Sequence, residues 1–305
     1  MPLRRDAAGG PMNPPSGSHC PTMTDGEFAL FQAYVERECA MALSSDKKYL
    51  FESRLARLLI EHGCQSFTDL YRELRNSNDT TVRDRIIDAI TTHETLWFRD
   101  DASWMGLQEH ALPALAQDAA RAGRSGIKMW SAACSTGQEP YSLAMIIDQF
   151  SRRTAGVQLS QFEITATDIS PSALFVAKAG RYDAISMARG FGPNWVHMRD
   201  LYFRQQGNVS TIDVKLQTAV SYKRFNLQDS FAQFALQDLV LLRNVAIYFS
   251  DTFKRDLFNR LATAIRPGGL LLLGSTEAVV DERRNFEMER MGSAFCYRRT
   301  SGGAR

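Results

Sequence analysis

Two acidic residues stand where strands of a parallel sheet would end, and both could bind a small ligand. Glu139 follows an apolar run at 126–133, and Asp168 lies near the end of a second run at 162–170. In an open parallel sheet, ligands bind beyond the carboxyl ends of the strands. Glu139 suits a ligand with positive charge or hydroxyls, and Asp168 suits the hydroxyls of a ribose. An alternative role for Asp168 is to cap the helix expected from Pro171.

The turn after the first strand, "WSAACSTGQEPYS", argues against a cofactor that is rich in phosphates. It contains neither the G-x-G-x-x-G fingerprint nor the Walker A pattern, and Gly137 is its one glycine. A pyrophosphate would need a glycine-rich nest of backbone N–H groups. A nucleoside with a cationic centre and no phosphates fits better. S-adenosylmethionine has these properties, and its amino group is matched by a carboxylate.

Strands that alternate with helices must position these side chains. Apolar runs rich in β-formers lie at 126–133, 162–170, 238–244 and 268–275, and amphipathic helical segments follow the first three. This alternation is typical of an α/β fold with a parallel sheet and helices on both faces. The closing segment, "FEMERMGSAFCYRRT", predicts a hairpin at the sheet edge.

The rest of the chain follows other patterns. Residues 1–22 are rich in Gly, Pro and Ser and are predicted to be disordered, and 300–305 form a second tail. From 23 to 110 the pattern predicts a helical domain and a linker, before an α/β domain at 111–299. Within that domain, residues 200–226 alternate at period two around a Gly-Asn turn, which predicts a small antiparallel subdomain.

Composition excludes several classes of protein. The net charge of +2 over 305 residues gives no global case for nucleic acid binding. The longest apolar run is far shorter than the ~20 residues of a membrane span, and the N-terminus lacks an apolar signal segment. Five scattered cysteines without C-x-x-C spacing argue against disulfides and zinc, so no metal is expected. We expect a cytoplasmic protein.

Several short blocks together resemble the chemotaxis receptor methyltransferases, the CheR family, over about residues 23–299. The blocks are, in order, "KKYLFESRL", "TTHETLWFRD", "WSAACSTGQEPYSLAM", "ITATDISPSAL", "FNL" and "LLRNVAIYF". The resemblance implies an all-α N-terminal domain and a class I S-adenosylmethionine-dependent methyltransferase domain, which is Rossmann-like and carries an inserted antiparallel β-subdomain. It also implies methyl transfer to glutamate side chains of chemoreceptors, which yields glutamyl methyl esters.

The resemblance assigns the run "ITTHETLWFRDDASW" to the closure of the cofactor pocket. The family's Asn, Thr and Arg positions correspond to His93, Thr95 and Arg99, so His93 departs from the pattern. Arg99 would pair with the carboxylate of the methionine moiety, for which a guanidinium offers bidentate geometry, and Thr95 would offer a hydroxyl. The alternative for Arg99 is a surface ion pair with Asp100 or Asp101.

The remaining site residues are carried over in the same way. Glu139 would bind the amino group of the cofactor, and Asp168 would bind its ribose hydroxyls. The other implied cofactor contacts are Asn226 and Leu227, beside the adenine, and Asn244 and Val245, at the end of the strand predicted at 238–244. Arg99 and Tyr248 are expected to orient the substrate. No strong general base is needed, because a glutamate side chain is already ionised near neutral pH.

The family implies that the methylated receptor sites lie on acidic helices of the cytoplasmic receptor domain, so a basic surface is the expected docking site. The predicted docking residues are Lys47, Lys48, Arg54 and Arg57, on a helix whose apolar face is Phe51, Leu55, Leu58 and Leu59. Simple solvation of this basic face is the alternative. The compact segment "RQQGNVST" predicts a member that does not need a C-terminal receptor pentapeptide. A monomer is expected.

Two other functions stay open at this point. One is a methyltransferase that acts on nucleic acid or on a small molecule. Nucleic acid enzymes of this kind usually carry [DN]-P-P-[YF] where this chain has "RNVAIYF". The other is a sensor that binds S-adenosylmethionine without catalysis, which the substitution at His93 keeps open. Trp97 and Phe98 either wall the pocket or belong to the core.

Overall fold

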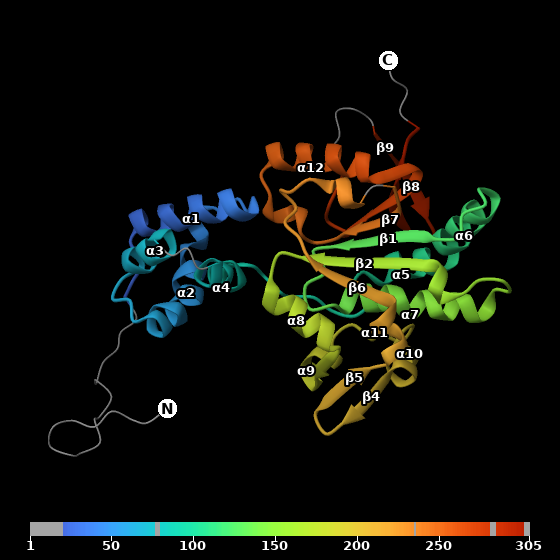
Figure 1. Cartoon of the computed structure of the whole chain (residues 1–305), viewed down its shortest axis with the longest axis horizontal. Coiled ribbons are helices and arrows are strands. Elements are labelled where there is room, and N and C mark those ends of the chain that lie inside the picture. Colours follow the sequence, from blue (N-terminus) through green and yellow to red (C-terminus); the bar gives the residue numbers. More distant parts are fainter. Residues whose placement is uncertain (1–20, 77–79, 235, 281–284, 302–305) are drawn as a thin grey trace.

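The computed structural model places an all-helical domain beside a larger domain built on a mixed sheet (Figure 1). It describes residues 21–76, 80–234, 236–280 and 285–301. The tails predicted at 1–22 and 300–305 lie largely outside these residues. No helix among the described residues is both long and apolar enough to cross a membrane.

Local sequence sets the ends of the helices in the N-terminal domain. These helices are α1 (Asp25–Cys39), α2 (Lys48–His62), α3 (Phe67–Asn76) and α4 (Thr80–Ile90). Thr24 and Glu27 form a capping box at the start of α1. Gly63 ends α2 in the left-handed conformation, as its position predicts. The predicted apolar face of α2 is confirmed as buried: Phe51, Leu55, Leu58 and Leu59.

The main sheet has seven strands in the order β6-β2-β1-β7-β8-β10-β9. They are β1 (Ile127–Ala132), β2 (Phe162–Asp168), β6 (Val220–Arg224), β7 (Gln237–Leu242), β8 (Ile265–Leu273), β9 (Phe286–Met291) and β10 (Ala294–Arg299). The strands from β6 to β8 pair in parallel, whereas β10 and β9 are antiparallel. The four apolar runs are therefore confirmed as strands, and so is the closing hairpin.

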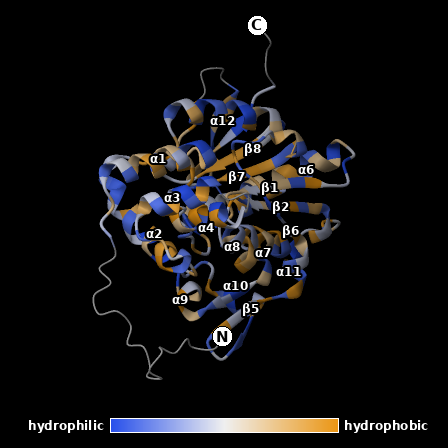
Figure 2. Ribbon diagram, turned by 60° about the vertical axis from the view of Figure 1, so that its left-hand side comes forward, coloured by the Kyte–Doolittle hydropathy of each residue, from blue (hydrophilic) through white to orange (hydrophobic). Residues whose placement is uncertain are grey.

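Helices cover both faces of this sheet, and successive strand residues point to opposite faces. The main covering helices are α5 (Asp101–Gly106), α6 (Leu112–Arg121), α7 (Gln138–Arg153), α8 (Pro171–Ala179) and α12 (Asp251–Ala264). Trp130 and Val240 face α12 and the helical domain, while Met129 and Leu241 face the side of α5, α6 and α7. Figure 2 shows largely hydrophobic central strands, which a sheet buried on both faces requires.

A second, three-stranded antiparallel sheet is inserted after α8. It consists of β3 (Arg181–Asp183), β4 (Phe203–Gln206) and β5 (Val209–Ile212), with the short helices α9 (Ala184–Met187), α10 (Val196–Tyr202) and α11 (Val214–Ala219). The predicted small antiparallel sheet is confirmed, but its bounds of 200–226 are wrong. Residues 220–224 form β6, which pairs in parallel with β2 in the main sheet. Period-two alternation reports one buried face and does not identify the partner strand.

Asp148 of α7 ties this inserted region to the main domain. Its side chain is 1% exposed and accepts hydrogen bonds from Tyr202 (2.7 Å), Arg152 (2.8 Å) and Lys215. Burial alone would raise the pKa of Asp148, but these three donors outweigh burial and hold the pKa below its ordinary value. The carboxylate therefore joins α7, α10 and α11.

The sequence predicted a domain boundary at residue 110, but packing places the boundary earlier in the chain, shortly after α4. Helix α4 ends at Ile90, whereas Trp104 and Leu107 are buried in the same cluster as strand residues of the main sheet. A helical pattern does not reveal which domain the helix packs against. The α/β domain therefore begins shortly after α4, with the run that carries His93.

Candidate cofactor and active site

One pocket brings together the residues that the sequence predicted for the cofactor. It is lined by His93, Thr95, Arg99, Glu139, Asp168, Asn226, Leu227, Asn244 and Val245, and also by Tyr248. The chain runs from β1 to β2 and β6 on one side, and from β7 to β8 on the other. The strand order therefore reverses between β1 and β7, which is where open α/β sheets bind ligands.

Asp168 is buried at the end of β2. Its two carboxylate oxygens accept hydrogen bonds from the backbone N–H groups of Ser135 (2.7 Å) and Ser170 (2.9 Å). Burial raises the pKa of Asp168, and these N–H groups act in the opposite direction. Ser170 caps α8 by accepting from the N–H of Ala173 (3.0 Å), so the capping alternative for Asp168 is wrong. A carboxylate has four acceptor sites, which leaves capacity for ligand hydroxyls.

Glu139 lies in the first turn of α7 and already has partners within the protein. Its Oε1 accepts from the hydroxyl of Ser131 (2.8 Å), and its Oε2 lies 3.3 Å from the guanidinium of Arg243. Burial raises the pKa of Glu139, whereas Arg243 and Ser131 lower it. The pKa of Glu139 stays above its ordinary value, and Arg243 favours the ionised form of this buried carboxylate.

Arg243 is the main site residue that sequence reasoning missed. Its side chain is 2% exposed, and its Nη2 lies 3.0 Å from Oδ2 of Asp100. The same nitrogen donates to the carbonyl of Arg99, and the guanidinium lies 5.4 Å from the ring centroid of Trp104. With Glu139 as a further partner, Arg243 joins the end of β7 to the starts of α5 and α7. The available signal was a charged residue at the end of the apolar run "DLVLLRN".

Arg99 lines the pocket, and its guanidinium has no hydrogen-bond or ion-pair partner in the described part of the chain. The two carboxylates proposed as surface partners are engaged elsewhere. Asp100 pairs with Arg243, and Asp101 accepts from the side chains of Asn194 (2.8 Å) and Trp195. The ion-pair alternative for Arg99 is therefore wrong, and its charge is available to a ligand carboxylate.

The imidazole of His93 is turned toward the end of α4. Its Nε2 lies 3.2 Å from Oγ1 of Thr91 and 3.2 Å from the carbonyl of Asp88. The carbonyl of His93 accepts from the hydroxyl of Ser135 (3.0 Å), so its backbone supports the turn after β1. His93 therefore links the helical domain to the pocket, and Thr95 lines the pocket two residues further on.

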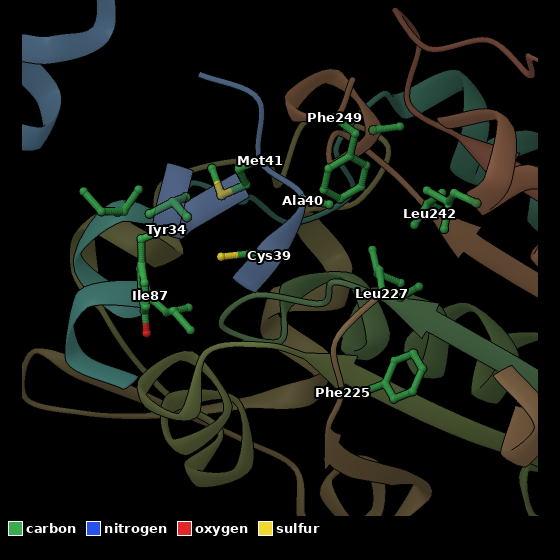
Figure 3. Close-up of a cluster of buried hydrophobic side chains, with 14 of the residues drawn as sticks. Tyr34, Cys39, Ala40, Met41, Ile87, Phe225, Leu227, Leu242 and Phe249 are labelled. Carbon is green, nitrogen blue, oxygen red and sulfur yellow. The ribbon is translucent and has the colours of Figure 1, made fainter. Parts of the chain in front are cut away.

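The helical domain closes one side of the pocket, which the sequence did not reveal. Asn226 donates from its side-chain amide to the carbonyl of Glu38, at the end of α1 (2.7 Å). Cys39 and Met41 line the pocket. Met41 forms an isolated antiparallel bridge with Phe249. Figure 3 shows the segment that carries Cys39, Ala40 and Met41 lying beside Phe249, with Ala40 next to its ring. The wall of the site therefore comes from both domains.

Trp97 and Phe98 belong to the core and not to the pocket wall. Both side chains are buried, with Trp97 stacked on Phe191 (5.3 Å between ring centroids) and Phe98 stacked on Trp195 (4.4 Å). Gly190 has a φ of 101°, and a Cβ there would overlap the carbonyl oxygen of Trp97. The inserted region thus packs against Trp97 and Phe98, on the side of their segment that faces away from the pocket.

Matches to family models decide the affiliation. Residues 93–295 match the family described as CheR methyltransferase, SAM binding domain, and residues 26–91 match CheR methyltransferase, all-alpha domain. The chain belongs to the CheR family. It is therefore an S-adenosylmethionine-dependent methyltransferase, and both parts of the CheR architecture are present.

Curated CheR relatives cover the chain almost from end to end. The chain is 38% identical over 275 residues to chemotaxis protein methyltransferase 1 of Pseudomonas aeruginosa, covering 90% of this chain and 98% of that protein. It is 37% identical to the chemotaxis protein methyltransferase of Vibrio anguillarum, covering 91% and 98%. It is 35% identical to chemotaxis protein methyltransferase Cher2 of Pseudomonas putida, covering 89% and 97%.

The chemistry of the pocket fits S-adenosylmethionine. The pocket lining contains a cation, Arg99, and two buried acceptors, Glu139 and Asp168, which match in kind the carboxylate, ammonium and hydroxyl groups of this cofactor. Oδ1 of Asn244 is buried without a partner among the described residues. A buried acceptor of this kind is normally satisfied, and a bound ligand can supply the missing donor.

Proposed function

We propose that this CheR-family enzyme methylates glutamate side chains on the cytoplasmic helical domain of chemoreceptors, forming glutamyl methyl esters. The observation that carries the proposal is a groove that adjoins the cofactor pocket. Tyr248 and Met41 line both, and the groove also contains the basic residues Lys47 and Arg54. An entrance lined by cations favours an anionic acceptor. The curated relatives named above, all chemotaxis protein methyltransferases, support an acceptor that belongs to chemotaxis.

The mechanism needs positioning more than acid–base catalysis. S-adenosylmethionine supplies an activated methyl group on a sulfonium. Arg99, Glu139 and Asp168 would hold the cofactor by its charged and hydroxyl groups. Tyr248 orients the incoming carboxylate, which is already ionised near neutral pH and needs no general base. Met41 of the helical domain pairs with Phe249 of the α/β domain, and together they close one side of the pocket, which limits access of water.

The four predicted docking residues fall into two groups. Lys47 and Arg54 line the groove that leads to Tyr248. Lys48 and Arg57 lie outside it and pair with Asp25 (2.6 Å) and Glu61 (2.7 Å). Lys47 is also paired, with Asp46 (2.9 Å), so position relative to the groove distinguishes the two groups. Arg54 also donates to the carbonyl of Ile90 (2.6 Å), which fixes its position at the end of α4. We therefore assign docking of the acidic receptor helix mainly to Lys47 and Arg54, with Lys48 and Arg57 contributing less.

Lys47 and Lys48 form a matched pair for testing this division. Lys47→Ala should raise the Michaelis constant for a receptor fragment by about two- to fivefold at low salt, as expected for a partly exposed charge. Lys48→Ala removes the same charge one residue away and should change the Michaelis constant for the receptor fragment less than Lys47→Ala does. Affinity for the product, S-adenosylhomocysteine, should be unchanged in both variants. Equal effects of the two substitutions would contradict the assignment.

The reaction itself is tested with methyl-labelled S-adenosylmethionine and purified cytoplasmic receptor fragments, followed by treatment with base. Carboxyl methyl esters release the label as volatile methanol. A fragment whose candidate glutamates are replaced by alanine is the control and should remain unlabelled. Base-stable label would show that the acceptor atom is not a carboxylate oxygen and would refute the proposal.

The inserted sheet supports a further proposal on receptor choice. The turn between β4 and β5 consists of Gly207 and Asn208 alone. Such a short turn offers little surface for a receptor pentapeptide, so we propose that this member acts without one. Receptors with and without a C-terminal pentapeptide should then be methylated with equal kcat/KM. We further propose a monomer in the cytoplasm, and analytical ultracentrifugation of the purified protein checks the monomer.

A further inference from the structure

Glu277 lies after β8 and binds the turn that follows β7. Its Oε2 accepts hydrogen bonds from the backbone N–H groups of Asn244 (2.6 Å) and Gly274 (2.9 Å). Its Oε1 accepts from the backbone N–H groups of Val245 (3.0 Å) and Ala246 (2.8 Å). One carboxylate therefore holds three consecutive N–H groups of the turn and one N–H of its own segment.

The turn has a conformation that needs such support. Asn244 has a φ of 58°, in the left-handed region that most residues other than glycine seldom adopt and that asparagine tolerates best among them. Consecutive N–H groups that converge on one point form a nest for an anion, and the carboxylate of Glu277 is that anion. Gly274 leaves the necessary room. A Cβ there would lie 2.6 Å from Nδ2 of Asn244 and 2.8 Å from Oε2 of Glu277.

This turn carries residues of the methyl-transfer site. Asn244 and Val245 line the cofactor pocket, and Oδ1 of Asn244 is buried without a partner among the described residues. Directly after them, the short 3-10 helix η5 (Ala246–Tyr248) leads to Tyr248, which also lines the pocket. A shift of the turn would therefore move the cofactor contacts and the residue proposed to orient the acceptor together.

We infer that Glu277 is a positioning residue for methyl transfer, which acts by holding the turn at Asn244 in its cofactor-binding shape. It acts through the turn and not by direct contact, because its four acceptor sites are all used by backbone N–H groups. The inference rests on S-adenosylmethionine as the cofactor and is independent of the glutamate acceptor in the proposed function.

Glu277→Gln tests this role with little change in size. A glutamine amide has a single acceptor oxygen, and its NH2 group would face N–H donors of the turn. We expect the affinity for S-adenosylhomocysteine, measured by calorimetry, to fall by about tenfold or more, since small displacements at a site have large effects. Glu277→Asp keeps the charge but reaches less far, and should recover part of the affinity. Glu289→Gln breaks an ion pair with Arg298 outside the pocket and is the control.

Two further variants separate positioning from folding. Gly274→Ala keeps the carboxylate and pushes on the side chain of Asn244, so it should weaken binding even if Glu277→Gln fails to fold. In an Asn244→Ala background, Glu277→Gln should reduce the affinity much less than in the wild type, because its effect passes through that residue. Wild-type affinity in the folded Glu277→Gln and Gly274→Ala proteins would overturn the inference. Independent, additive effects of Asn244→Ala and Glu277→Gln would overturn it as well.

Discussion

Replacing Arg243 by methionine should destabilise this enzyme strongly. Methionine keeps an unbranched apolar stem of similar length but removes the charge. The guanidinium is 2% exposed and faces two carboxylates, Asp100 and Glu139, whose side chains are 23% and 12% exposed. The substitution would leave both carboxylates without the cation that pairs with them. A buried charge that loses its partner destabilises the folded state.

The magnitude follows from the burial of these groups. Removing one partner of a buried ion pair costs about 3–5 kcal/mol. Asp100 is partly exposed and also accepts from the N–H and hydroxyl of Ser275 (both 3.2 Å), which favours the lower end of this range. At about 2.1 cal/mol/K of unfolding entropy per residue, a loss of about 3 kcal/mol lowers the melting temperature of a chain of this length by about 5 °C.

Thermal unfolding of Arg243→Met, Glu139→Gln and the double variant measures the coupling directly. Glu139→Gln removes one charge that Arg243 balances, so the double variant should be less destabilised than the two single effects combined, by about 1–2 kcal/mol. Agreement with simple additivity within about 0.5 kcal/mol would refute the ion-pair reasoning. A wild-type melting temperature for Arg243→Met would refute it more directly.

The same variant has a predictable pH dependence. Burial raises the pKa of Glu139, and Arg243 opposes that rise. Without Arg243 the pKa of Glu139 should rise further, so the carboxylate would become protonated at a higher pH than in the wild type. Since an ionised Glu139 is proposed to bind the ammonium group, affinity for S-adenosylhomocysteine should begin to fall at a higher pH as the solution is acidified. Identical pH profiles for the two proteins would contradict this.

Three other predictions follow from contacts described above. Arg99→Ala should weaken binding of S-adenosylhomocysteine by about 10- to 100-fold, as expected for loss of a charge-assisted hydrogen bond, and Arg99→Lys should recover part of it; an unchanged affinity in calorimetry would sink the role. The pKa of Asp148 is depressed in the folded protein, so its stabilising effect is present above about pH 4 and is lost as the pH falls through the native pKa. Near neutral pH, Asp148→Asn should therefore unfold at lower urea concentrations than the wild type. In acid the two proteins should unfold at similar urea concentrations. Lys215→Met should show a smaller effect of the same sign. Gly190→Ala should displace the backbone of Trp97 and weaken cofactor binding, and a wild-type affinity would show that the run adjusts freely.

The sequence by itself determined the elements and the general place of the site. Apolar runs bounded by turn residues located β1, β2, β7 and β8, because strand period and breaker residues are local properties. The positions of Glu139 and Asp168 after the first two strands placed them at one edge of the sheet, because parallel strands end on the same side. Matching short blocks then predicted the remaining cofactor contacts, and the folded chain gathers these residues in one pocket.

Only the tertiary structure decided which charges meet. Arg243 pairs with Asp100 and Glu139, which lie far from it along the chain. Glu277 likewise binds the backbone of the distant Asn244. The closure of the pocket by the helical domain, the membership of β6 in the main sheet and the position of Arg54 have the same origin. Local patterns report which face of an element is buried, whereas the identity of the partner across a buried contact depends on packing between distant segments.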